Sequence, residues 1–249
     1  MSGIDLKTPQ ELEIMRRAGR IVAGLLKLME ASVKPGVTTG GLDGIAEEFV
    51  RSQGAEPAFK GYYGYPATIC ASVNEEVVHG IPGKRVLTEG DIIGVDVGVK
   101  LDGYYSDAAR TFAVGRVDKE SQKLIEVTRE ALARGIEKAV EGNRLGDISW
   151  AVQSYAEKHG FSVVRQFVGH GIGRNLHEEP QVPNFGKPNQ GPRLTVGMAL
   201  AIEPMLNVGT QEIEVLADGW TVVTKDRRRS GHFEQTVFVG KTKPEIVTE

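Results

Sequence analysis

The chain contains a faint internal repeat, and each copy carries an apolar stretch that ends in an acidic residue. The segment 87–96 (LTEGDIIGVD) recurs 107 residues later as the segment 194–203 (LTVGMALAIE). Successive side chains of a strand point to opposite faces, so Asp96 and Glu203 would lie away from the apolar face, beside glycine or alanine. Small neighbours leave room for a group to sit against each carboxylate. Two such strands facing each other predict a shared cation.

The repeat extends beyond the two acidic strands. Five earlier positions match at a constant offset of 106 residues: Gly36, Gly40, Leu42, Phe49 and Gly54 are followed by Gly142, Gly146, Ile148, Tyr155 and Gly160. The tripeptide His-Gly-Ile occurs at both 79–81 and 170–172. A second acid also follows each strand, Asp107 and Glu234, each ahead of a threonine and a glycine in a looser register.

The length and composition of the chain suit one domain rather than two independent ones. A chain of 249 residues with 40% hydrophobic residues can bury a sizeable core. No low-complexity linker divides it. We therefore expect a single domain over residues 1–249, built from two related halves at roughly 33–115 and 139–240.

Charge and cysteine content exclude several classes of protein. The net charge is −3 and no long basic block is present, which argues against tight electrostatic binding of nucleic acid. The basic run 225–229 is most simply a solvated turn. Cys70 is the single cysteine, which excludes an intramolecular disulfide and fits a reducing compartment. No apolar stretch approaches membrane-spanning length, so we expect a cytoplasmic, soluble protein.

Periodicity and turn signals predict mixed helices and strands. Thr8, Pro9 and Glu11 form a capping-box start for a helix, and Asp102-Gly103 is a strong hairpin signal. Other helices are expected at about 42–53, 119–140 and 148–159, and strands at about 68–73, 77–79, 92–99 and 108–114. Loops are expected at 62–66 and at 180–192, where the chain would line a cleft.

The acidic residues of the repeat point to metal chemistry. Four carboxylates and one imidazole form the candidate set: Asp96, Asp107, His170, Glu203 and Glu234. This mixture suits a pair of Mn, Fe, Co or Zn ions rather than a thiolate zinc site. Without metal, the clustered acids would repel one another and stay partly protonated. Asp107 alone is more simply a turn residue after Gly103, but the whole set favours two divalent ions.

Six motifs spread over nearly the whole chain resemble one family. They are Gly64-Tyr65-Pro66, the segment 74–82 (NEEVVHGIP), Gly169-His170-Gly171-Ile172-Gly173, His177-Glu178-Glu179-Pro180, Ile202-Glu203-Pro204 and Asp218-Gly219-Trp220. Together they resemble the type I methionine aminopeptidases, within the broader creatinase-like family. The resemblance implies an α+β "pita-bread" fold, with two pseudo-symmetric halves around a curved, largely antiparallel sheet and helices outside. Such a fold would account for the internal repeat.

The resemblance also implies roles for individual residues. By matching motif positions, the metal ligands would be Asp96, Asp107, His170, Glu203 and Glu234. Glu203 would also accept a proton from the attacking water and pass it to the leaving amine. His177 would stabilise the charge that develops on the scissile carbonyl, and His79 would hydrogen-bond the backbone of the peptide.

The implied substrate is a polypeptide with an N-terminal methionine and a small second residue. Its side chain needs an apolar pocket that suits a flexible thioether, and the resemblance nominates Phe59, Tyr62, Tyr65, Cys70, Leu176 and Trp220. Asn74 and Ser230 match positions that in some relatives help to bind a monovalent cation. The implied enzyme is a cytoplasmic monomer that acts on nascent proteins, contacts the ribosome only transiently, and binds neither a specific nucleic acid nor a membrane.

Three alternatives stay open on the sequence alone. Prolidases and aminopeptidases P share the five-ligand pattern, but they normally carry a large preceding domain, and fewer than 100 residues precede Asp96. A metal-free binding protein on this fold would contact nascent chains or ribosomes, but such proteins generally lose ligands. Type II methionine aminopeptidases carry a long insertion late in the domain, where only a short loop separates His177 from Glu203. The lack of a zinc-finger extension is typical of bacterial type I enzymes.

Overall fold

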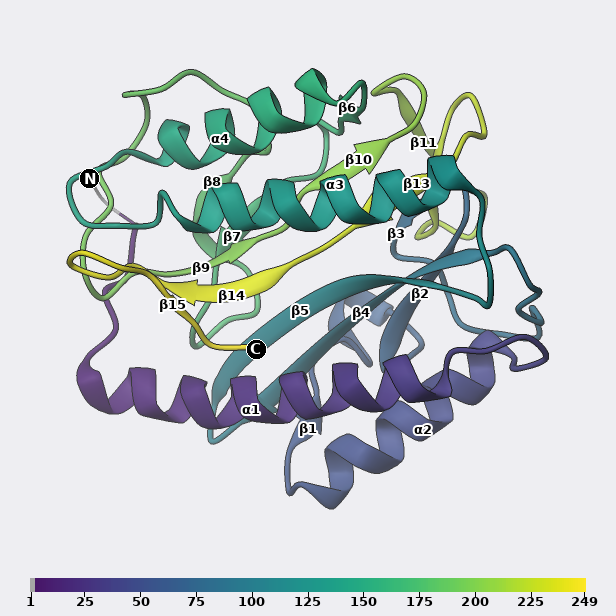
Figure 1. The fold of residues 1–249 in the computed structure, drawn as a ribbon. Coiled ribbons are helices and arrows are strands. Elements are labelled where there is room, and N and C mark those ends of the chain that lie inside the picture. The colour runs from purple at the N-terminus through teal and green to yellow at the C-terminus, as the bar shows by residue number, and fades with distance from the viewer. Residues whose placement is uncertain (1–2) are drawn as a thin grey trace.

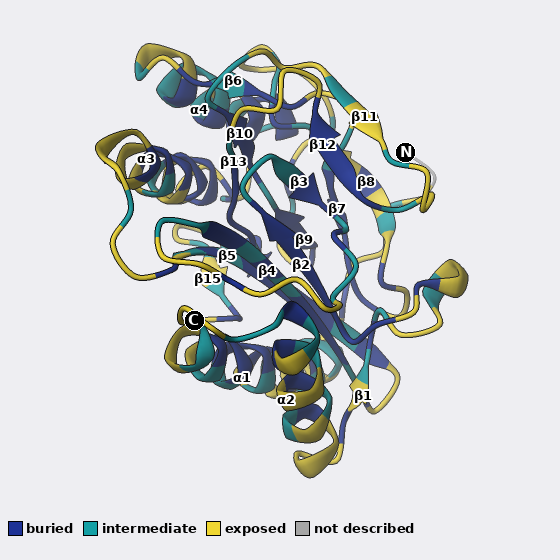
Figure 2. Ribbon diagram, turned by 90° about the vertical axis from the view of Figure 1, so that its right-hand side faces the viewer, coloured by how far each residue is buried: buried dark blue, intermediate teal, exposed yellow. Residues whose placement is uncertain are grey.

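Two pairs of helices lie against a layer of β-strands in the computed structural model, which describes residues 3–249 (Figure 1). The first pair is α1 (Pro9–Ser32) and α2 (Thr39–Ser52), and the second is α3 (Lys119–Ile136) and α4 (Leu145–Lys158). Figure 2 shows that these helices bury the sides that face the strands and expose their outer sides. None of the helices in the described residues is long and apolar enough to cross a membrane.

The first two helices begin where a threonine caps them. The predicted capping box of α1 is confirmed: Thr8 Oγ1 accepts from the backbone N of Glu11 (3.4 Å), and the Glu11 carboxylate accepts from the backbone N of Thr8 (2.8 Å). Helix α2 begins three residues before its predicted start, because Thr38 Oγ1 accepts from the backbone N of Gly41 at 3.0 Å. Each cap satisfies an N–H group that has no partner inside the helix.

Strand β4 (Ile92–Leu101) is the centre of the first half. It pairs antiparallel with β1 (Glu56–Pro57), β2 (Ile69–Val73) and β5 (Tyr104–Ala113). The predicted hairpin between β4 and β5 is confirmed, and its turn residues Asp102 and Gly103 have φ values of 49° and 82°. Positive φ at both turn positions matches the right-handed twist of the strands, so pairing starts directly at the turn and β5 begins earlier than predicted.

In the second half, two shorter strands share the role of β4, and the break between them holds Glu203 and Pro204. Strand β9 (Ala199–Ile202) pairs with β7 (Gly169–Gly171) and β14 (Gln235–Phe238), while β10 (Met205–Asn207) pairs with β6 (Ser162–Val163) and β13 (Ser230–His232). The remaining short elements are η1 (Tyr62–Gly64), β3 (Glu76–Val78), β8 (Glu178–Val182), β11 (Ile213–Val215), β12 (Val222–Thr224) and β15 (Glu245–Ile246).

The chain enters the second helix of each half through the same backbone contacts. Gly36 N donates to Leu87 O at 2.8 Å, and Gly142 N donates to Leu194 O at 3.1 Å. The two glycines have φ values of 89° and 93°, a left-handed conformation that residues with a Cβ rarely adopt. The offsets of 106 and 107 residues seen in the sequence therefore correspond to equivalent hydrogen bonds in space.

The alternation predicted for β4 is confirmed. Its four inward residues are fully buried among apolar residues of α1 and α2: Ile93, Val95, Val97 and Val99. Asp96 lies on the opposite face, where it lines a cavity. On β9, Leu200 and Ile202 pack in the same way with apolar residues of α3 and α4. The helix pairs thus cover one face of the strands and leave the other face to the acidic residues.

The two halves meet where β5 lies beside β14 (Figure 1). Glu234 N donates to Ala109 O at 2.9 Å, and Ala109 N donates to Glu234 O at 3.3 Å. These two residues are 125 positions apart, and each pairs with the other. They therefore mark the centre of the repeat, and the structural counterpart of Glu234 is an alanine.

Two threonines, also 125 positions apart, make identical contacts on either side of this centre. Thr111 Oγ1 donates to His232 O (2.8 Å) and accepts from His232 N (2.9 Å). Thr236 Oγ1 donates to Asp107 O (2.9 Å) and accepts from Asp107 N (3.1 Å). The counterpart of Asp107 is therefore His232. The loose match of Asp107 with Glu234 in the sequence is wrong by two residues.

The recurring His-Gly-Ile tripeptide is also outside the structural repeat. His170 lies in β7 opposite Ala201 of β9. The equivalent position in the first half, opposite Gly94 of β4, is Ser72 of β2. His79 instead follows β3, so the shared tripeptide places two histidines in unrelated parts of the sheet layer.

Candidate metal centre and substrate cleft

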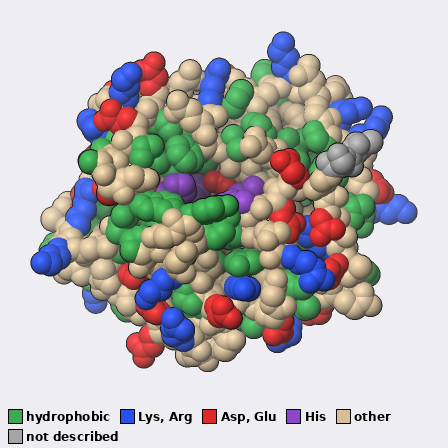
Figure 3. All heavy atoms as spheres, turned by 180° about the vertical axis from the view of Figure 1, so that it is seen from behind, with side chains coloured by type: hydrophobic (Ala, Val, Ile, Leu, Met, Phe, Trp, Pro, Cys, Tyr) green, Lys and Arg blue, Asp and Glu red, His purple; other side chains and the backbone are tan. Residues whose placement is uncertain are grey.

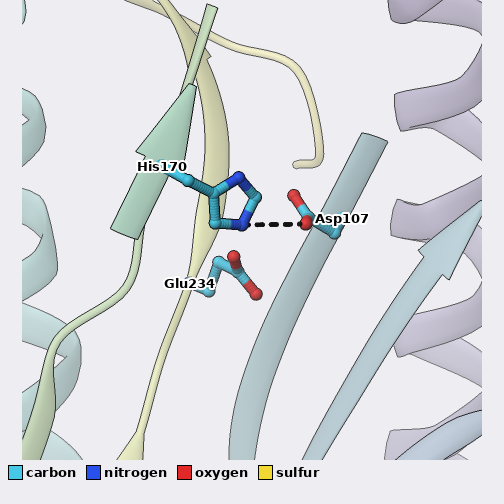
Figure 4. A group of neighbouring side chains, drawn as sticks. All are labelled: Asp107, His170 and Glu234. Atoms are coloured by element: carbon cyan, nitrogen blue, oxygen red, sulfur yellow. Dashed lines mark ion pairs between the residues drawn. The ribbon is translucent and has the colours of Figure 1, made fainter. Parts of the chain in front are cut away.

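The strands bring all five predicted ligands to one cavity. Asp96 comes from β4, Asp107 from β5 and His170 from β7, while Glu203 directly follows β9 and Glu234 directly precedes β14. The first half thus supplies two of these side chains and the second half three. Figure 4 shows Asp107, His170 and Glu234 pointing toward one another.

His170 presents a free nitrogen to the acidic groups. Its Nδ1 lies 2.9 Å from the carbonyl oxygen of Gly171, a contact that places the proton of the neutral ring on Nδ1. The lone pair of Nε2 then faces Asp107 Oδ2 and Glu203 Oε1, each 3.5 Å away. Burial lowers the pKa of His170 to about 4, so the ring is neutral at physiological pH. A lone pair that faces two carboxyl groups calls for a cation between them.

The carboxyl groups are also poorly compensated by the protein itself. Burial raises the pKa of Asp107 to about 6 and raises the pKa of Asp96 well above its usual range, where the charge of Asp107 adds to the effect. Burial followed by the neighbouring carboxylates likewise raises the pKa values of Glu203 and Glu234. The buried Asp96 Oδ1 has no hydrogen-bond partner among the described residues.

These features fit a divalent metal centre. Ligand atoms of Asp107, His170 and Glu234 lie within 4.8 Å of one another. Asp96 and Glu203 lie outside this tightest group but line the same cavity, as a second ion would require. Oxygen donors with one imidazole suit Mn, Fe, Co or Zn, and bound cations would keep the carboxylates ionised.

A cavity of about 250 Å³ leads from these residues to the surface. Its lining includes all eight residues that the sequence analysis assigned to substrate contacts: Phe59, Tyr62, Tyr65, Cys70, His79, Leu176, His177 and Trp220. Figure 3 shows the same region as a hollow with histidine side chains at its floor and hydrophobic side chains around it. The cavity is therefore polar at the acids and largely apolar on the way to them.

His177 lies at the exposed rim, beside the acids. Its Nδ1 is 2.8 Å from Tyr62 Oη, and its ring centroid is 4.3 Å from that of His170. Burial, and then the neighbouring His170, lowers the pKa of His177 to about 4. When Tyr62 donates its proton to Nδ1, the N–H of the neutral ring is at Nε2.

His79 lies on another wall of the cavity, in a left-handed backbone conformation with a φ of 60°. Its ring meets the rings of Phe167 and Trp220 edge-on, at centroid distances of 5.4 Å and 6.4 Å. Burial, and then His177, lowers the pKa of His79 to about 4. The ring is therefore a neutral hydrogen-bonding group held between aromatic side chains.

Tyr65 and Trp220 form the apolar end of the cavity. Their rings meet at 5.0 Å and 74°, and Tyr65 Oη lies 3.0 Å from the carbonyl oxygens of Ile69 and Gly80. Cys70 is buried beside them, opposite Asp96 in the pairing of β2 with β4. Burial raises the pKa of its thiol, which is therefore a neutral, polarisable wall of the pocket.

Some residues of the cavity escaped the sequence analysis. They are Tyr63, Val78, Phe167 and Val168. Phe167 and Val168 directly precede the motif that contains His170, so their position along the chain gave a usable signal. His232 is also close: its Nε2 lies 3.8 Å from Glu203 Oε2. The sequence signal for His232 was its position next to Gly231 and two residues before Glu234.

Comparisons with known sequences all match this chain to peptidases. The model of metallopeptidase family M24 matches residues 13–241. A methionine aminopeptidase of Clostridium perfringens is 55% identical over 245 residues, 98% of each chain. Methionine aminopeptidase 1 of Bacillus subtilis is 54% identical over 242 residues, which is 97% of this chain and 98% of the relative.

Solved structures agree with the sequence comparisons. The methionine aminopeptidase from Rickettsia prowazekii superposes with a TM-score of 0.97 at 44% identity, over 99% of this chain and 100% of that one. The prolidase from Pyrococcus furiosus has a TM-score of 0.77 at 21% identity, over 98% of this chain and 65% of that one. The first likeness confirms the expected pita-bread fold, and the second shows a shared fold alone.

Proposed function

The chain belongs to metallopeptidase family M24, and from this membership we propose that it is a methionine aminopeptidase. In this proposal it hydrolyses the first peptide bond of polypeptides that begin with methionine and have a small second residue. The observation that carries the proposal is the convergence of His170 and four acids at the floor of a largely apolar cleft. Full-length relatives with this name, at 54–55% identity, support the same reading.

We assign five residues to a pair of divalent ions: Asp96, Asp107, His170, Glu203 and Glu234. When bound, such ions would lower the pKa of a water molecule from about 15.7 to about 7 and would polarise the scissile carbonyl. The ligand set accepts Co, Mn, Fe or Zn. Because four carboxylates balance the charge of two divalent ions, the filled centre is close to neutral.

Glu203 is the proposed proton carrier. Its side chain is only 13% exposed and lines the cavity together with the other acids. Glu203 takes the proton of the attacking water and delivers it to the amine of the departing peptide. Its place in the break between β9 and β10 leaves its carboxyl group directed into the cavity.

The two cavity histidines act as hydrogen-bond donors in this proposal. With Tyr62 bound to Nδ1, His177 offers Nε2–H to the oxygen of the scissile carbonyl as negative charge develops there. His79 donates to the backbone of the incoming peptide. Both rings are neutral at physiological pH, because burial lowers their pKa values to about 4.

The apolar end of the cavity is the proposed methionine pocket. Its walls are Phe59, Tyr62, Tyr65, Cys70, Leu176 and Trp220. Aromatic rings make favourable contacts with sulfur, and a flexible thioether fills an irregular apolar space well. The N-terminal amine would then lie toward the metal centre, which restricts cleavage to the first peptide bond.

A monovalent cation near Asn74 and Ser230 remains part of the proposal. Ser230 N donates to Asn74 O at 2.9 Å, and Ser230 Oγ lies 3.3 Å from Leu206 O, so carbonyl and hydroxyl oxygens gather there. We further propose that residues 1–249 form one catalytic domain that acts as a cytoplasmic monomer on nascent chains. Any contact with the ribosome is transient.

Peptide hydrolysis with and without metal tests the proposed function. Chelator-stripped protein receives Mn, Fe, Co or Zn and is assayed with Met-Ala-Ser, with a Met-Lys peptide and with an Ala-Pro peptide. We expect metal-restored cleavage of Met-Ala-Ser alone. Cleavage mainly before proline would place the protein with the prolidases, and no cleavage with any metal would favour a binding protein on this fold.

A further inference from the structure

His232 has no task in the proposed function, although it lies against the metal centre. Its side chain is only 4% exposed, and its Nε2 lies 3.8 Å from Glu203 Oε2. Among the described residues, Nε2 of His232 is one of three buried side-chain atoms without a hydrogen-bond partner. A buried polar atom without a partner is costly, so its position calls for an explanation.

The symmetry of the fold explains how His232 reaches the centre. Thr111 fixes its backbone in the same way that Thr236 fixes the backbone of Asp107. A Cβ added to Gly94 would lie 3.9 Å from the Cβ of His232, which places His232 over the face of β4 that carries Asp96. The second half therefore directs an imidazole to the place where the first half directs a carboxylate.

Glu203 lies between two imidazoles as a result. Its Oε1 is 3.5 Å from His170 Nε2, and its Oε2 is 3.8 Å from His232 Nε2. His170 turns a lone pair toward the acid, since its proton lies on Nδ1. A neutral imidazole has one N–H and one lone pair, and a nitrogen that faces a carboxylate is stabilised by carrying the proton.

We propose that His232 is a positioning residue whose Nε2–H donates a hydrogen bond to Glu203 Oε2. This bond fixes the carboxylate so that Oε1 faces His170 and the metal side of the cavity. The separation of 3.8 Å is about 1 Å longer than a charge-assisted hydrogen bond, and such contacts tighten when an active site is filled. The inference rests on the proposed function, because Glu203 is the proton carrier there.

The position of the imidazole proton is the first test. Nitrogen-15 spectra of protein with labelled histidines report which ring nitrogen carries the proton. The spectra are recorded for the metal-free protein and for the protein loaded with Zn, which is diamagnetic. The His232 signals are those that disappear in His232→Gln. We expect the proton on Nε2. A proton on Nδ1 of His232 in the zinc-loaded protein, where the Glu203 carboxylate is ionised, would overturn the proposal.

Two substitutions at one position form the second test. His232→Leu removes the donor, and His232→Gln keeps an N–H donor on a shorter polar side chain. For His232→Leu we expect kcat and metal affinity to fall about 10- to 100-fold, as for other groups that orient a metal ligand, with KM nearly unchanged. His232→Gln should recover most of this loss. Wild-type kcat and metal affinity in His232→Leu would contradict the proposal.

A histidine outside the cavity provides the matched control. His159 lies at the end of α4, with Nδ1 2.8 Å from Tyr155 O, and His159→Leu should leave kcat and metal affinity unchanged. If His232→Leu does not fold, the proposed hydrogen bond is still tested by His232→Gln and by the position of the imidazole proton. If the unaltered protein cleaves no peptide, the proposed function fails, whereas the proton position continues to test the contact with Glu203.

Discussion

Glu203 lies at a break between two strands, and this irregular backbone directs its side chain into the cavity. Pro204 follows it and cannot donate a ladder hydrogen bond, so the strand is interrupted and the Glu203 side chain lies at the break. Asn184 Nδ2 donates to the Glu203 carbonyl at 3.0 Å and holds this irregular backbone. The carboxyl group is therefore placed by the backbone while its two oxygens remain available to the cavity.

Replacement of Glu203 by glutamine should separate folding from catalysis. Glu203→Gln preserves the shape of the side chain but removes its charge and its capacity to accept a proton. We expect a folded protein whose kcat for Met-Ala-Ser falls by at least about 100-fold, because general acid-base catalysis contributes 10²–10⁴. Circular dichroism checks the fold and metal analysis checks the ions. Near-normal turnover would refute the role of Glu203.

His79→Ala should behave differently from a ligand substitution. His79 contacts aromatic rings rather than the acids, so its loss should lower kcat/KM while the metal content of the purified protein stays near normal. The corresponding change at His170 should lower the metal content directly, because Nε2 faces two of the acids. Loss of both ions from His79→Ala would show that the two histidines have exchanged roles.

The candidate metal ligands could be recognised by their residue type more reliably than by the alignment of the two halves of the repeat. Asp96 and Glu203 were found from the internal repeat and from alternation, because an acidic residue in an otherwise apolar stretch is easy to recognise. His232 could not be found this way. The sequence matched Asp107 with Glu234, whereas the backbone pairs Glu234 with Ala109, and a shift of two residues keeps the same face of the strand and so leaves no trace in the hydrophobic pattern.

At the scale of elements, local signals predicted the first half better than the second. The first half has a long hairpin with a two-residue turn between two strands of ten residues each. The second half divides the same task among strands of three or four residues, whose length is too short for periodicity to register. Long-range pairing, not local preference, determines these strands.

One buried ion pair ties the segment before α1 to the strand that follows His177. Lys7 Nζ lies 2.5 Å from Glu178 Oε2, and the two side chains are 2% and 9% exposed. Glu178 Oε1 accepts from the backbone N of Asn175 at 2.9 Å, so the same carboxylate also fixes the turn that leads to His177. The lysine stem passes Gly173, where an added Cβ would lie 2.3 Å from Lys7 Cε.

Lys7→Met should therefore destabilise the protein strongly. It leaves the Glu178 carboxylate buried without its partner, which costs about 3–5 kcal/mol in comparable pairs. The double variant Lys7→Met/Glu178→Gln should recover part of this loss, because the buried charge is gone. Urea unfolding of the wild type, of Lys7→Met, of Glu178→Gln and of the double variant measures the coupling energy between the two side chains.

A surface pair gives the control for this cycle. Arg17 and Asp102 also join distant segments, at 2.9 Å, but both side chains are about half exposed. Arg17→Met should cost less than about 1 kcal/mol. If Lys7→Met and Arg17→Met lower the free energy of unfolding equally, the ion pair of Lys7 with Glu178 does not behave as a buried pair.

At the scale of the molecule, the metal centre should govern how stability depends on pH. Without metal, the pKa values of Asp96, Asp107, Glu203 and Glu234 are raised by burial, so the folded protein binds more protons than the unfolded chain. The free energy of unfolding then falls as pH rises through the folded pKa values. The cavity histidines, with pKa values lowered to about 3–4, act in the opposite direction, and their effect fades above about pH 7.5, where the histidines of the unfolded chain are largely neutral.

Above about pH 7.5 the carboxyl effect dominates, and this sets the prediction. Chelator-treated protein should lose stability as the pH rises above about 7.5, by on the order of 1 kcal/mol per pH unit, because buried Asp96, Glu203 and Glu234 hold their protons longer than the unfolded chain does. Added Mn should remove this slope, because the ions replace the protons that the acids would otherwise hold. Urea midpoints at several pH values measure it. A metal-free midpoint that is constant or rises over this range would contradict the raised pKa values.

The pairing of Ala109 with Glu234 also has a consequence for biosynthesis. Two of the proposed ligands come from the first half and three from the second, and Glu234, directly before β14, reaches its place through backbone pairing with Ala109 of β5. A growing chain that has completed its first half holds Asp96 and Asp107 without their partners. If these five residues form the metal centre, a partly synthesised chain that lacks Glu234 should have no peptidase activity.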